Sequence, residues 1–448
     1  MKFKSKVAIN SCRFTRKLVR LVGKGGTAFP GTVAMKFNPE VLKDVSKGVR
    51  TVLVTGTNGK TTTTLMIAEG LEKAGYSVFS NRSGANMTSG ITTEFIMNFK
   101  HGEPEKKFAV IECDEAYVRH VAPLLNPEAI VVTSLFQDQM DRMGDVDSVM
   151  NIIKKGTDAS DATLCLNGDC NLVASLGENK KAVYFGFETA LPYKEEETDS
   201  TPFHCVKCGE KMEYDYHTYA HLGAFRCPSC GYKRPALDVA VTDCSFRIDS
   251  SLLTVRSGNE KYHVKVALPA AYNAYNAIAA MSVFKALSIP YDGLFEALEN
   301  MSSAFGRMER FVYDGNDLQM ILVKNPVGYN QALGFVSEMD PDITLALLLN
   351  NRESDGTDIS WLKDVDFEKF VEEHPSAEII VGGECRDDLE KRLREAGAEN
   401  IINLDSFEKV AEKIEEKGKP AVILPNYTCM IDMRELLAGK TGEKSYWE

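Results

Sequence analysis

The sequence predicts an α/β protein in which two domains, each built on a parallel sheet, follow one another along the chain. Short apolar runs alternate with helical patterns from residue 51 onward, and a glycine-rich turn joins the first run to the first helical pattern. The alternation breaks near residue 190, and a second series begins after residue 310. Strands alternating with helices are typical of parallel sheets. The break therefore divides the chain into two α/β units.

Length, charge and cysteine content limit the classes of protein to consider. The 448 residues are enough for about two to four domains. A net charge of −12 argues against a general nucleic-acid binder, because such proteins need a basic surface. No apolar run of about 18 residues or apolar leader occurs, so we expect neither a transmembrane segment nor a secretory signal. The eleven scattered cysteines fit a reducing compartment. We expect a cytoplasmic protein, with peripheral binding at the inner face of the membrane as a further option.

Residues 1–45 form a basic N-terminal segment. Its first 39 residues include nine lysines and arginines and no acidic residue. Apolar residues recur there at helical spacing, namely Phe14, Leu18, Leu21 and Val22. Such an amphipathic basic helix would suit an anionic membrane surface or a pyrophosphate-bearing lipid. A helix packed on its own domain with a solvated basic face is the simpler interpretation, and we favour it.

The central domain is expected over residues 46–310. Its predicted strands are residues 52–55, 78–80, 108–112, 130–134, 164–167 and 183–185. Two helical patterns between residues 270 and 300 close this domain. Alternating strands and helices continue over residues 311–448, the C-terminal α/β domain, with strands expected at residues 320–323, 344–349, 379–381 and 421–424.

The segment TVLVTGTNGKTTTT, residues 51–64, predicts a loop that binds nucleotide phosphates. A glycine-rich turn before a helix can point backbone N–H groups at phosphate oxygens, the lysine neutralises them, and a following threonine hydroxyl can bind Mg²⁺. Val54 stands where the general P-loop pattern requires glycine, so this loop is shortened. A mere tight connection is the alternative, but the flanking strand and helix favour ATP and Mg²⁺ binding. The loop residues are Gly56, Thr57, Asn58, Gly59, Lys60, Thr61 and Thr62.

Acidic residues follow two of the predicted strands. Glu112 ends the run FAVIE, and Asp114 and Glu115 come directly after it. Ligands of open α/β sheets bind at the carboxyl ends of strands, so Glu112 is a candidate Mg²⁺ ligand. Asp138 and Asp141, in SLFQDQMDRMG, follow the next strand in the same way. Solvated loop acids are the alternative interpretation.

Four cysteines predict a zinc ribbon inserted at residues 203–232. Two Cys-x-x-Cys pairs are separated by eighteen residues: Cys205, Cys208, Cys227 and Cys230. Four thiolates complete a tetrahedral structural zinc site and leave no open position for catalysis. The alternative, that these are unrelated buried cysteines, is much weaker. Because the insertion is short, metal binding should also stabilise its fold.

The order of these motifs resembles the Mur ligases. TGTNGKTT, the strand-end Glu112, a DQMD segment, YNAYN and GRME follow one another as in that superfamily. The resemblance implies that ATP phosphorylates a carboxylate and that an amine displaces the phosphate. It also implies that Asn273 and Asn276 lie near the adenine and that Arg307 reaches a phosphate. Gln139 replaces the usual histidine, and Lys154, with Lys155 as the alternative, matches the spacing of a carbamylated lysine.

One branch of the superfamily is particularly similar. A short N-terminus, an inserted four-cysteine ribbon and the segment NNRESDGTDISWLKDVDFE resemble the synthetase subunits of the lipid II isoglutaminyl synthases. The resemblance implies a GatD-like glutamine amidotransferase partner and amidation of the α-carboxylate of D-glutamate in lipid II. It implies too that Asp355, or Asp358 as runner-up, completes the partner's Cys-His pair. An Asp-Gly turn is the structural alternative. Rival functions are an amino-acid ligase like folylpolyglutamate synthase and a non-catalytic ATP-binding scaffold.

Overall fold

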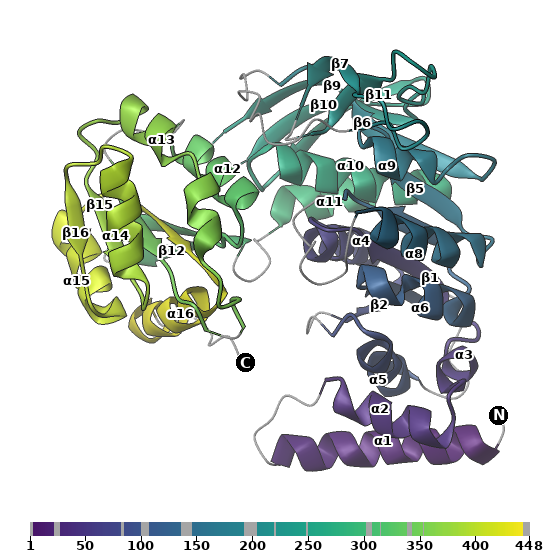
Figure 1. The fold of residues 1–448 in the computed structure, drawn as a ribbon. Coiled ribbons are helices and arrows are strands. Elements are labelled where there is room, and N and C mark those ends of the chain that lie inside the picture. Colours follow the sequence, from purple (N-terminus) through teal and green to yellow (C-terminus); the bar gives the residue numbers. More distant parts are fainter. Residues whose placement is uncertain are drawn as a thin grey trace. The chain divides into compact units, whose positions relative to one another are not determined.

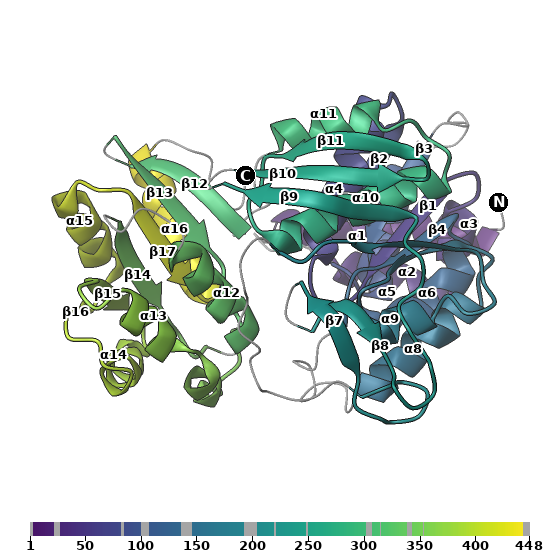
Figure 2. The ribbon, with the colours of Figure 1, turned by 90° about the horizontal axis from the view of Figure 1, so that it is seen from above.

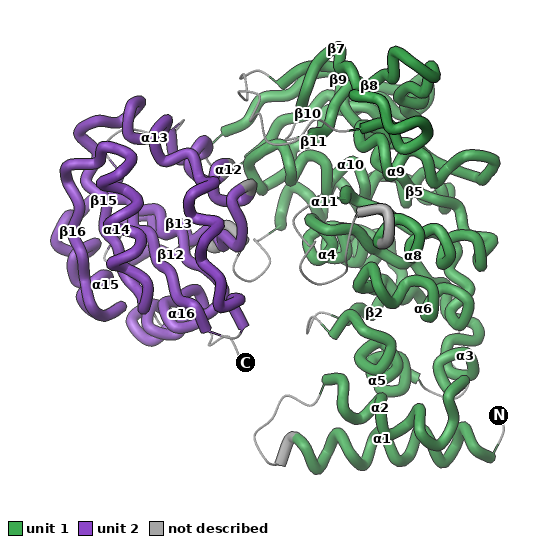
Figure 3. Tube along the Cα trace, viewed as in Figure 1, with its two compact units in different colours: residues 1–301 green, residues 302–448 purple. Residues whose placement is uncertain are grey.

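The chain forms two compact units, residues 1–301 and residues 302–448 (Figure 3). The boundary lies nine residues before the expected one, so Arg307 begins the first strand of unit 2. The computed structural model describes residues 3–21, 27–81, 85–99, 107–135, 146–191, 204–218, 221–247, 250–301, 307–313, 315–337, 343–352 and 354–441.

The basic N-terminal segment folds into three helices that belong to unit 1. They are α1 (Phe3–Leu21), α2 (Phe29–Phe37) and α3 (Val41–Val45) (Figure 1). All three contact α5 (Thr88–Asn98). Ala8, Ile9 and Cys12 of α1 are buried. Apolar burial thus attaches this segment to the rest of unit 1.

A nine-stranded sheet forms the centre of unit 1, in the order β11-β10-β9-β6-β5-β4-β1-β3-β2. Along the sheet from β2 through β3, β1, β4, β5 and β6 to β9, neighbouring strands pair in parallel. In contrast, β10 pairs antiparallel with both β9 and β11 (Figure 2). The expected parallel sheet is therefore mixed at one end. The strands are β1 (Arg50–Thr55), β2 (Ser77–Ser80), β3 (Lys107–Glu112), β4 (Ala129–Val132), β5 (Thr163–Asn167), β6 (Ala182–Phe187), β9 (Val239–Phe246), β10 (Ser251–Ser257) and β11 (Glu260–Val266). All six strands expected before the insertion are present.

Helices connect the parallel strands, as in other α/β sheets. They are α4 (Lys60–Lys73), α6 (Val118–Leu125), α8 (Val146–Asp158) and α9 (Asn171–Ser175), with a short 3-10 helix, η1 (Glu115–Tyr117). After the sheet come α10 (Ala271–Ala286) and α11 (Asp292–Asn300). A Cβ on Gly293 would lie 2.6 Å from the backbone nitrogen of Ala74, so α11 needs glycine to approach the end of α4 this closely.

The inserted ribbon carries its own two-stranded antiparallel sheet, β7 (Glu213–His217) and β8 (Gly223–Arg226). Its small core consists of Cys205, Met212, Phe225, Cys227 and Tyr232, which pack with Ala174 of α9. The insertion is thus anchored to the central domain through α9 and does not extend the large sheet.

Unit 2 is a six-stranded α/β domain with the strand order β12-β13-β17-β14-β15-β16. Only the β12–β13 pair is antiparallel. The strands are β12 (Arg307–Tyr313), β13 (Asn316–Ile321), β14 (Thr344–Leu348), β15 (Ile379–Gly382), β16 (Ile401–Asn403) and β17 (Ala421–Pro425). The helices are α12 (Pro326–Ser337), η3 (Ser360–Asp364), α13 (Phe367–Glu373), α14 (Arg386–Glu395), α15 (Phe407–Lys417) and α16 (Tyr427–Thr441).

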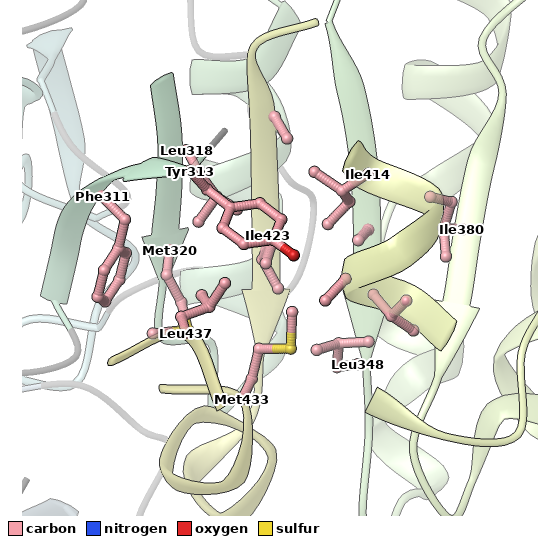
Figure 4. Packing of buried hydrophobic residues seen from close by; sticks show 14 of the residues in the cluster. Phe311, Tyr313, Leu318, Met320, Leu348, Ile380, Ile414, Ile423, Met433 and Leu437 are labelled. Carbon is pink, nitrogen blue, oxygen red and sulfur yellow. The ribbon is translucent and has the colours of Figure 1, made fainter. Parts of the chain in front are cut away.

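One hydrophobic cluster of unit 2 lies on one face of its sheet. Met320, Leu348 and Ile423, from three different strands, pack against Ile414 of α15 and Met433 of α16 (Figure 4). Every residue of this group is almost fully buried. The four strands predicted for the C-terminal domain are all present. Each of them supplies apolar residues to this cluster.

Candidate functional site

The turn between β1 and α4 has the backbone conformation of a phosphate-binding loop. Gly56 and Gly59 have φ angles of 126° and 83°, which L side chains rarely adopt. A Cβ on Gly56 would lie 2.3 Å from Oγ1 of Thr133. The backbone N–H of Thr57 donates to the carbonyl of Ser134 at 2.7 Å, and Thr133 donates to the carbonyl of Asn58 at 2.6 Å. The residues that directly follow β4 therefore hold the loop through hydrogen bonds.

The loop leads directly into α4, whose first residue is Lys60. The first N–H groups of a helix lack intrahelical acceptors and carry the positive end of the helix dipole. Thr62, predicted to bind nucleotide, lies in this first turn with its side chain buried. Its contribution to an anion site is therefore its backbone N–H. The loop and helix start together provide backbone donors and a cation within six consecutive residues.

Lys60 is held by three acceptors inside the site. Its Nζ donates to the carbonyls of Gly56 at 2.5 Å and Thr57 at 3.1 Å, and to Oε1 of Glu115 at 3.1 Å. Burial raises the pKa of Glu115, and the charge of Lys60 opposes that shift. The second oxygen of Glu115 is buried and has no hydrogen-bond partner among the described residues. Glu115 is thus a buried counter-ion for the loop lysine, a role that the sequence analysis did not give it.

Thr61 and Glu112, the two predicted Mg²⁺ ligands, lie together. The hydroxyl of Thr61 donates to Oε2 of Glu112 at 2.8 Å. The pairing of β1 with β3 produces this contact, since Val54 is opposite Glu112 in the register. A hydroxyl and a carboxylate beside a phosphate loop are hard oxygen donors of the kind that Mg²⁺ prefers. The arrangement fits the metal without any change of ligand type.

Two asparagines that the sequence analysis missed position Glu112. Asn81, directly after β2, accepts from the N–H of Glu112 at 2.9 Å and donates to its carbonyl at 2.8 Å. The side chain of Asn86 donates to Oε1 of Glu112 at 3.2 Å. Both carboxylate oxygens are therefore oriented, one by Asn86 and one by Thr61. The place of Asn81 at the end of a predicted strand was a signal that could have identified it.

Asn276 lies against the end of the phosphate loop. A Cβ on Gly59 would lie 2.2 Å from its Oδ1, which also accepts from the hydroxyl of Thr63 at 3.2 Å. The amide of Asn276 donates to Oδ1 of Asn273 at 3.3 Å, and Asn273 donates to the carbonyl of Pro269 at 2.7 Å. Both asparagines are buried. Asn276 contacts the loop directly and Asn273 contacts it through Asn276, whereas their place near adenine stays a prediction.

The structure does not place every predicted residue relative to this site. Asp138, Gln139 and Asp141 lie outside the described residues. Arg307 belongs to unit 2, and its contact with phosphate stays a prediction. Lys154 forms an exposed ion pair with Asp158 at 2.8 Å, and its carbamylation stays a prediction.

The four ribbon cysteines converge as their spacing predicts. Their sulfur atoms all lie within 4.8 Å of one another. The pairs are crossed, with Cys205 3.6 Å from Cys230 and Cys208 3.5 Å from Cys227. The N–H of Cys230 points to the sulfur of Cys227 and lowers the pKa of that thiol to about 7. Four convergent thiols, one of them readily ionised, fit a structural Zn²⁺ site.

A buried polar cluster joins the ribbon to α10. Asp169 accepts from the hydroxyl of Tyr275 at 2.6 Å and from Nη1 of Arg234 at 3.0 Å. Burial raises the pKa of Asp169 to about 6, against the opposing charge of Arg234. The hydroxyls of Tyr275 and Thr218 are 2.5 Å apart. Since Tyr275 precedes Asn276, the same turn of α10 contacts the ribbon and the phosphate loop.

Asp355 occupies a fixed position in unit 2. Its two carboxylate oxygens accept from the backbone N–H of Thr428 at 2.8 Å and from the Thr428 hydroxyl at 2.5 Å. Thr428 lies in the first turn of α16, where a carboxylate is favoured by the helix dipole. Asp358, the runner-up, is exposed and accepts from the N–H of Ser360 at 2.8 Å, which lowers its pKa. Asp355 is thus the more firmly oriented of the two.

Comparison with known proteins accounts for nearly the whole chain. Two family models match: Mur ligase middle domain over residues 54–227, and MurT ligase C-terminal over residues 322–430. A Streptococcus pneumoniae protein named lipid II isoglutaminyl synthase (glutamine-hydrolyzing) subunit MurT is 34% identical, over 98% of each chain. A protein of the same name from Staphylococcus aureus is 34% identical, over 96% of this chain and 97% of that one.

The solved structures support the same fold. A pseudomurein peptide ligase type C from Methanothermus fervidus matches with a TM-score of 0.66 and 22% identity, over 89% of this chain and 80% of the other. At this identity the likeness concerns the fold alone. The Mur ligase fold expected from the order of motifs is confirmed.

Removal of the loop lysine should affect binding and stability separately. We expect Lys60→Ala to abolish ATP binding and to destabilise the fold by about 3–5 kcal/mol, because it leaves Glu115 buried and unpaired. The deficit should grow as the pH rises, since an unpaired Glu115 is easier to bury when protonated. Calorimetric titration with ATP and urea unfolding at several pH values measure the two effects.

A second substitution separates the two roles of Lys60. Lys60→Ala combined with Glu115→Gln should recover most of the stability and none of the ATP binding. Lys73→Ala, at the exposed end of the same helix, is the control and should leave the stability almost unchanged, because exposed ion pairs contribute little. Full ATP affinity in either Lys60 variant would contradict the assignment of the phosphate loop.

The ribbon should contain about one zinc ion per chain. Cys208→Ser should reduce the zinc content to near zero and lower the melting temperature of the insertion, because metal binding stabilises such small folds. Elemental analysis and thermal unfolding with and without chelator measure both. Cys244→Ser, a buried cysteine of β9 outside the cluster, should retain the metal. A wild-type chain that is metal-free and equally stable would refute the zinc site.

Proposed function

Because the chain belongs to the MurT family of Mur ligase-like proteins, we propose that it is the synthetase subunit of a lipid II isoglutaminyl synthase. It is an ATP-dependent carbon–nitrogen ligase of peptidoglycan synthesis. The reaction converts the α-carboxylate of D-glutamate in the stem peptide to an amide, giving D-isoglutamine. The full-length similarity to relatives named for this activity carries the proposal.

The geometry of unit 1 supports the ATP half of the reaction. Backbone N–H groups of the loop and of the first turn of α4 would hold the phosphates, with Lys60 as the cation. Lys60 would exchange Glu115 for the more highly charged phosphate group. Phosphoryl transfer depends mainly on positioning and charge stabilisation, so no protein nucleophile is required.

Mg²⁺ fits the oxygen pair formed by Thr61 and Glu112. When bound, it would neutralise phosphate charge that develops during transfer. Asn81 holds the backbone of Glu112, and Asn86 donates to its carboxylate, whose other oxygen faces Thr61. These residues are proposed as the metal-holding part of the site, and Zn²⁺ in the ribbon as a structural ion.

The second half-reaction would use ammonia. After the glutamate carboxylate is phosphorylated, ammonia attacks the acyl carbon and the C–N bond forms. The bond from that carbon to the bridging oxygen breaks, so phosphate leaves with one of the two original carboxylate oxygens and takes up the proton that the nitrogen loses. The relatives are named as subunits of a glutamine-hydrolysing synthase, so we propose that a GatD-like amidotransferase supplies the ammonia. Asp355 would then orient the histidine of that partner, as a triad acid does. Its fixed carboxylate at the start of α16 suits this task.

The substrate would be lipid II at the inner face of the cytoplasmic membrane. Within the described residues, no helix combines the length and apolar character needed to cross a bilayer. We therefore propose that the protein meets its lipid-linked substrate as a peripheral protein.

One reconstitution tests the function. The chain, a GatD-like partner, ATP, glutamine and lipid II should give a product lighter by about one mass unit, the change from a carboxylic acid to an amide. Mass spectrometry of the muropeptide measures it. Addition of an amino acid would instead favour a folylpolyglutamate synthase-like ligase, and ATP binding without any product would favour a scaffold.

Asp355 should be needed only for glutamine-driven turnover. We expect Asp355→Asn to reduce glutamine-dependent amidation at least a hundredfold, while ammonium salts still support amidation, because the synthetase site lies in unit 1. Asp358→Asn is the matched control and should retain both activities. Equal loss with glutamine and with ammonium would place Asp355 in the synthetase reaction instead.

A further inference from the structure

The helix α1 is attached to unit 1 along one side. Ser5 and Cys12 are fully buried. The hydroxyl of Ser5 donates to Oδ2 of Asp44 at 2.6 Å, and Nη2 of Arg13 donates to the carbonyl of Phe99 at 2.6 Å. These contacts fix the rotation of the helix about its axis. The side opposite Cys12 is therefore held toward solvent.

That outer side is apolar. Phe3, Phe14 and Leu18 are 80%, 64% and 46% exposed. With about 3.6 residues per turn, their spacing places them within about 60° of one another and roughly opposite Cys12. We refer to these three residues as the outer apolar face of α1. Packing of α1 on unit 1 does not account for these three residues, because that packing uses another side of the helix.

The neighbouring helix α2 adds two more exposed rings. Phe29 and Phe37 are 59% and 51% exposed, and α1 and α2 lie side by side (Figure 1). The large exposed hydrophobic residues of the described chain number eight, and five of them belong to these two helices. Single exposed apolar residues are ordinary, whereas such a concentration marks an interaction surface.

The charges around the outer apolar face are basic. Lys6 and Lys17 lie on one flank of it and Lys4 on the other, and all three are exposed. The first 39 residues contain no acidic residue, although the whole chain has a net charge of −12. An apolar stripe with lysines along its edges is the pattern of a helix that lies in a membrane interface, where the lysine amines reach lipid phosphates.

We propose that the outer face of α1 docks the protein on an anionic lipid bilayer. Phe3, Phe14 and Leu18 enter the boundary between headgroups and acyl chains, and Lys6 and Lys17 contact lipid phosphates. The inference rests on the proposed function, because that function places the substrate in the same membrane. A second copy of the chain fits less well, since it would bring the basic flanks of two α1 helices together.

Sedimentation of the full-length chain with vesicles tests the proposal. The wild type should bind vesicles of phosphatidylglycerol and phosphatidylcholine, and bind phosphatidylcholine alone at least tenfold more weakly. Phe14→Ser with Leu18→Ser should weaken binding at least tenfold. Lys6→Gln with Lys17→Gln should do so by about 25-fold, at about fivefold per lysine, and should reduce the salt dependence.

Controls of the same chemistry lie elsewhere on the chain. Val312→Ser removes a side chain that is 62% exposed in β12, and Lys233→Gln with Lys391→Gln removes two exposed charges. These variants should bind vesicles like the wild type. Equal weakening by the controls, or no binding of the wild type to anionic vesicles, would overturn the proposal.

Two further measurements separate the alternatives. A lipid-free dimer that Phe14→Ser with Leu18→Ser converts to monomer, seen by analytical ultracentrifugation, would assign the face to a second copy and overturn the membrane proposal. Amidation of detergent-dissolved lipid II needs no bilayer. Retained amidation without vesicle binding would therefore defeat the docking proposal alone, and vesicle binding without amidation would defeat the proposed function alone.

Discussion

The first turns of α10 hold the phosphate loop and the cysteine-rich ribbon at the same time. Asn276 presses its carboxamide oxygen against Gly59, so closely that any side chain there would collide with it. Its neighbour Tyr275 reaches Asp169, which also binds Arg234 beyond the ribbon. Successive residues of a helix point about 100° apart, so one short segment can serve two directions. A displacement of α10 would disturb the nucleotide site and the insertion together.

The positive charge of Lys60 is compensated by groups of the loop and of its surroundings. Two loop carbonyls and Glu115 surround its amine. Buried ion pairs are costly to break on one side only, because the remaining charge loses both water and its partner. A bound phosphate group would replace Glu115 as the acceptor, and the raised pKa of Glu115 would ease its protonation at that moment. Lys60 and Glu115 thus compensate each other's charge.

The sequence predicts those parts of the site that depend on local pattern. The loop glycines, the strand-end Glu112 and the four cysteines follow from spacing and from adjacent strands. The contacts that orient them join distant segments: Asn81 and Glu112 are 31 residues apart, and Asp169 and Tyr275 are 106 apart. Such partners depend on strand order, and the order places β1 between β3 and β4. The mixed end of the large sheet was missed for the same reason, since alternation alone does not reveal strand direction.

Asp355 has an environment that leaves its negative charge available. Thr428 holds it with two neutral donors, which orient the carboxylate without cancelling its charge. The nearby Arg352 is occupied by Glu384 and Asp432, at 2.8 and 2.9 Å. Each carboxylate oxygen still has a lone pair beyond the one that Thr428 uses. In the proposed complex, a half-exposed carboxylate that is fixed in this way and keeps free lone pairs would accept an imidazole N–H of the partner and stabilise the imidazolium formed during glutamine hydrolysis. An aspartate that served only to close a turn would need neither the fixed orientation nor the uncompensated charge.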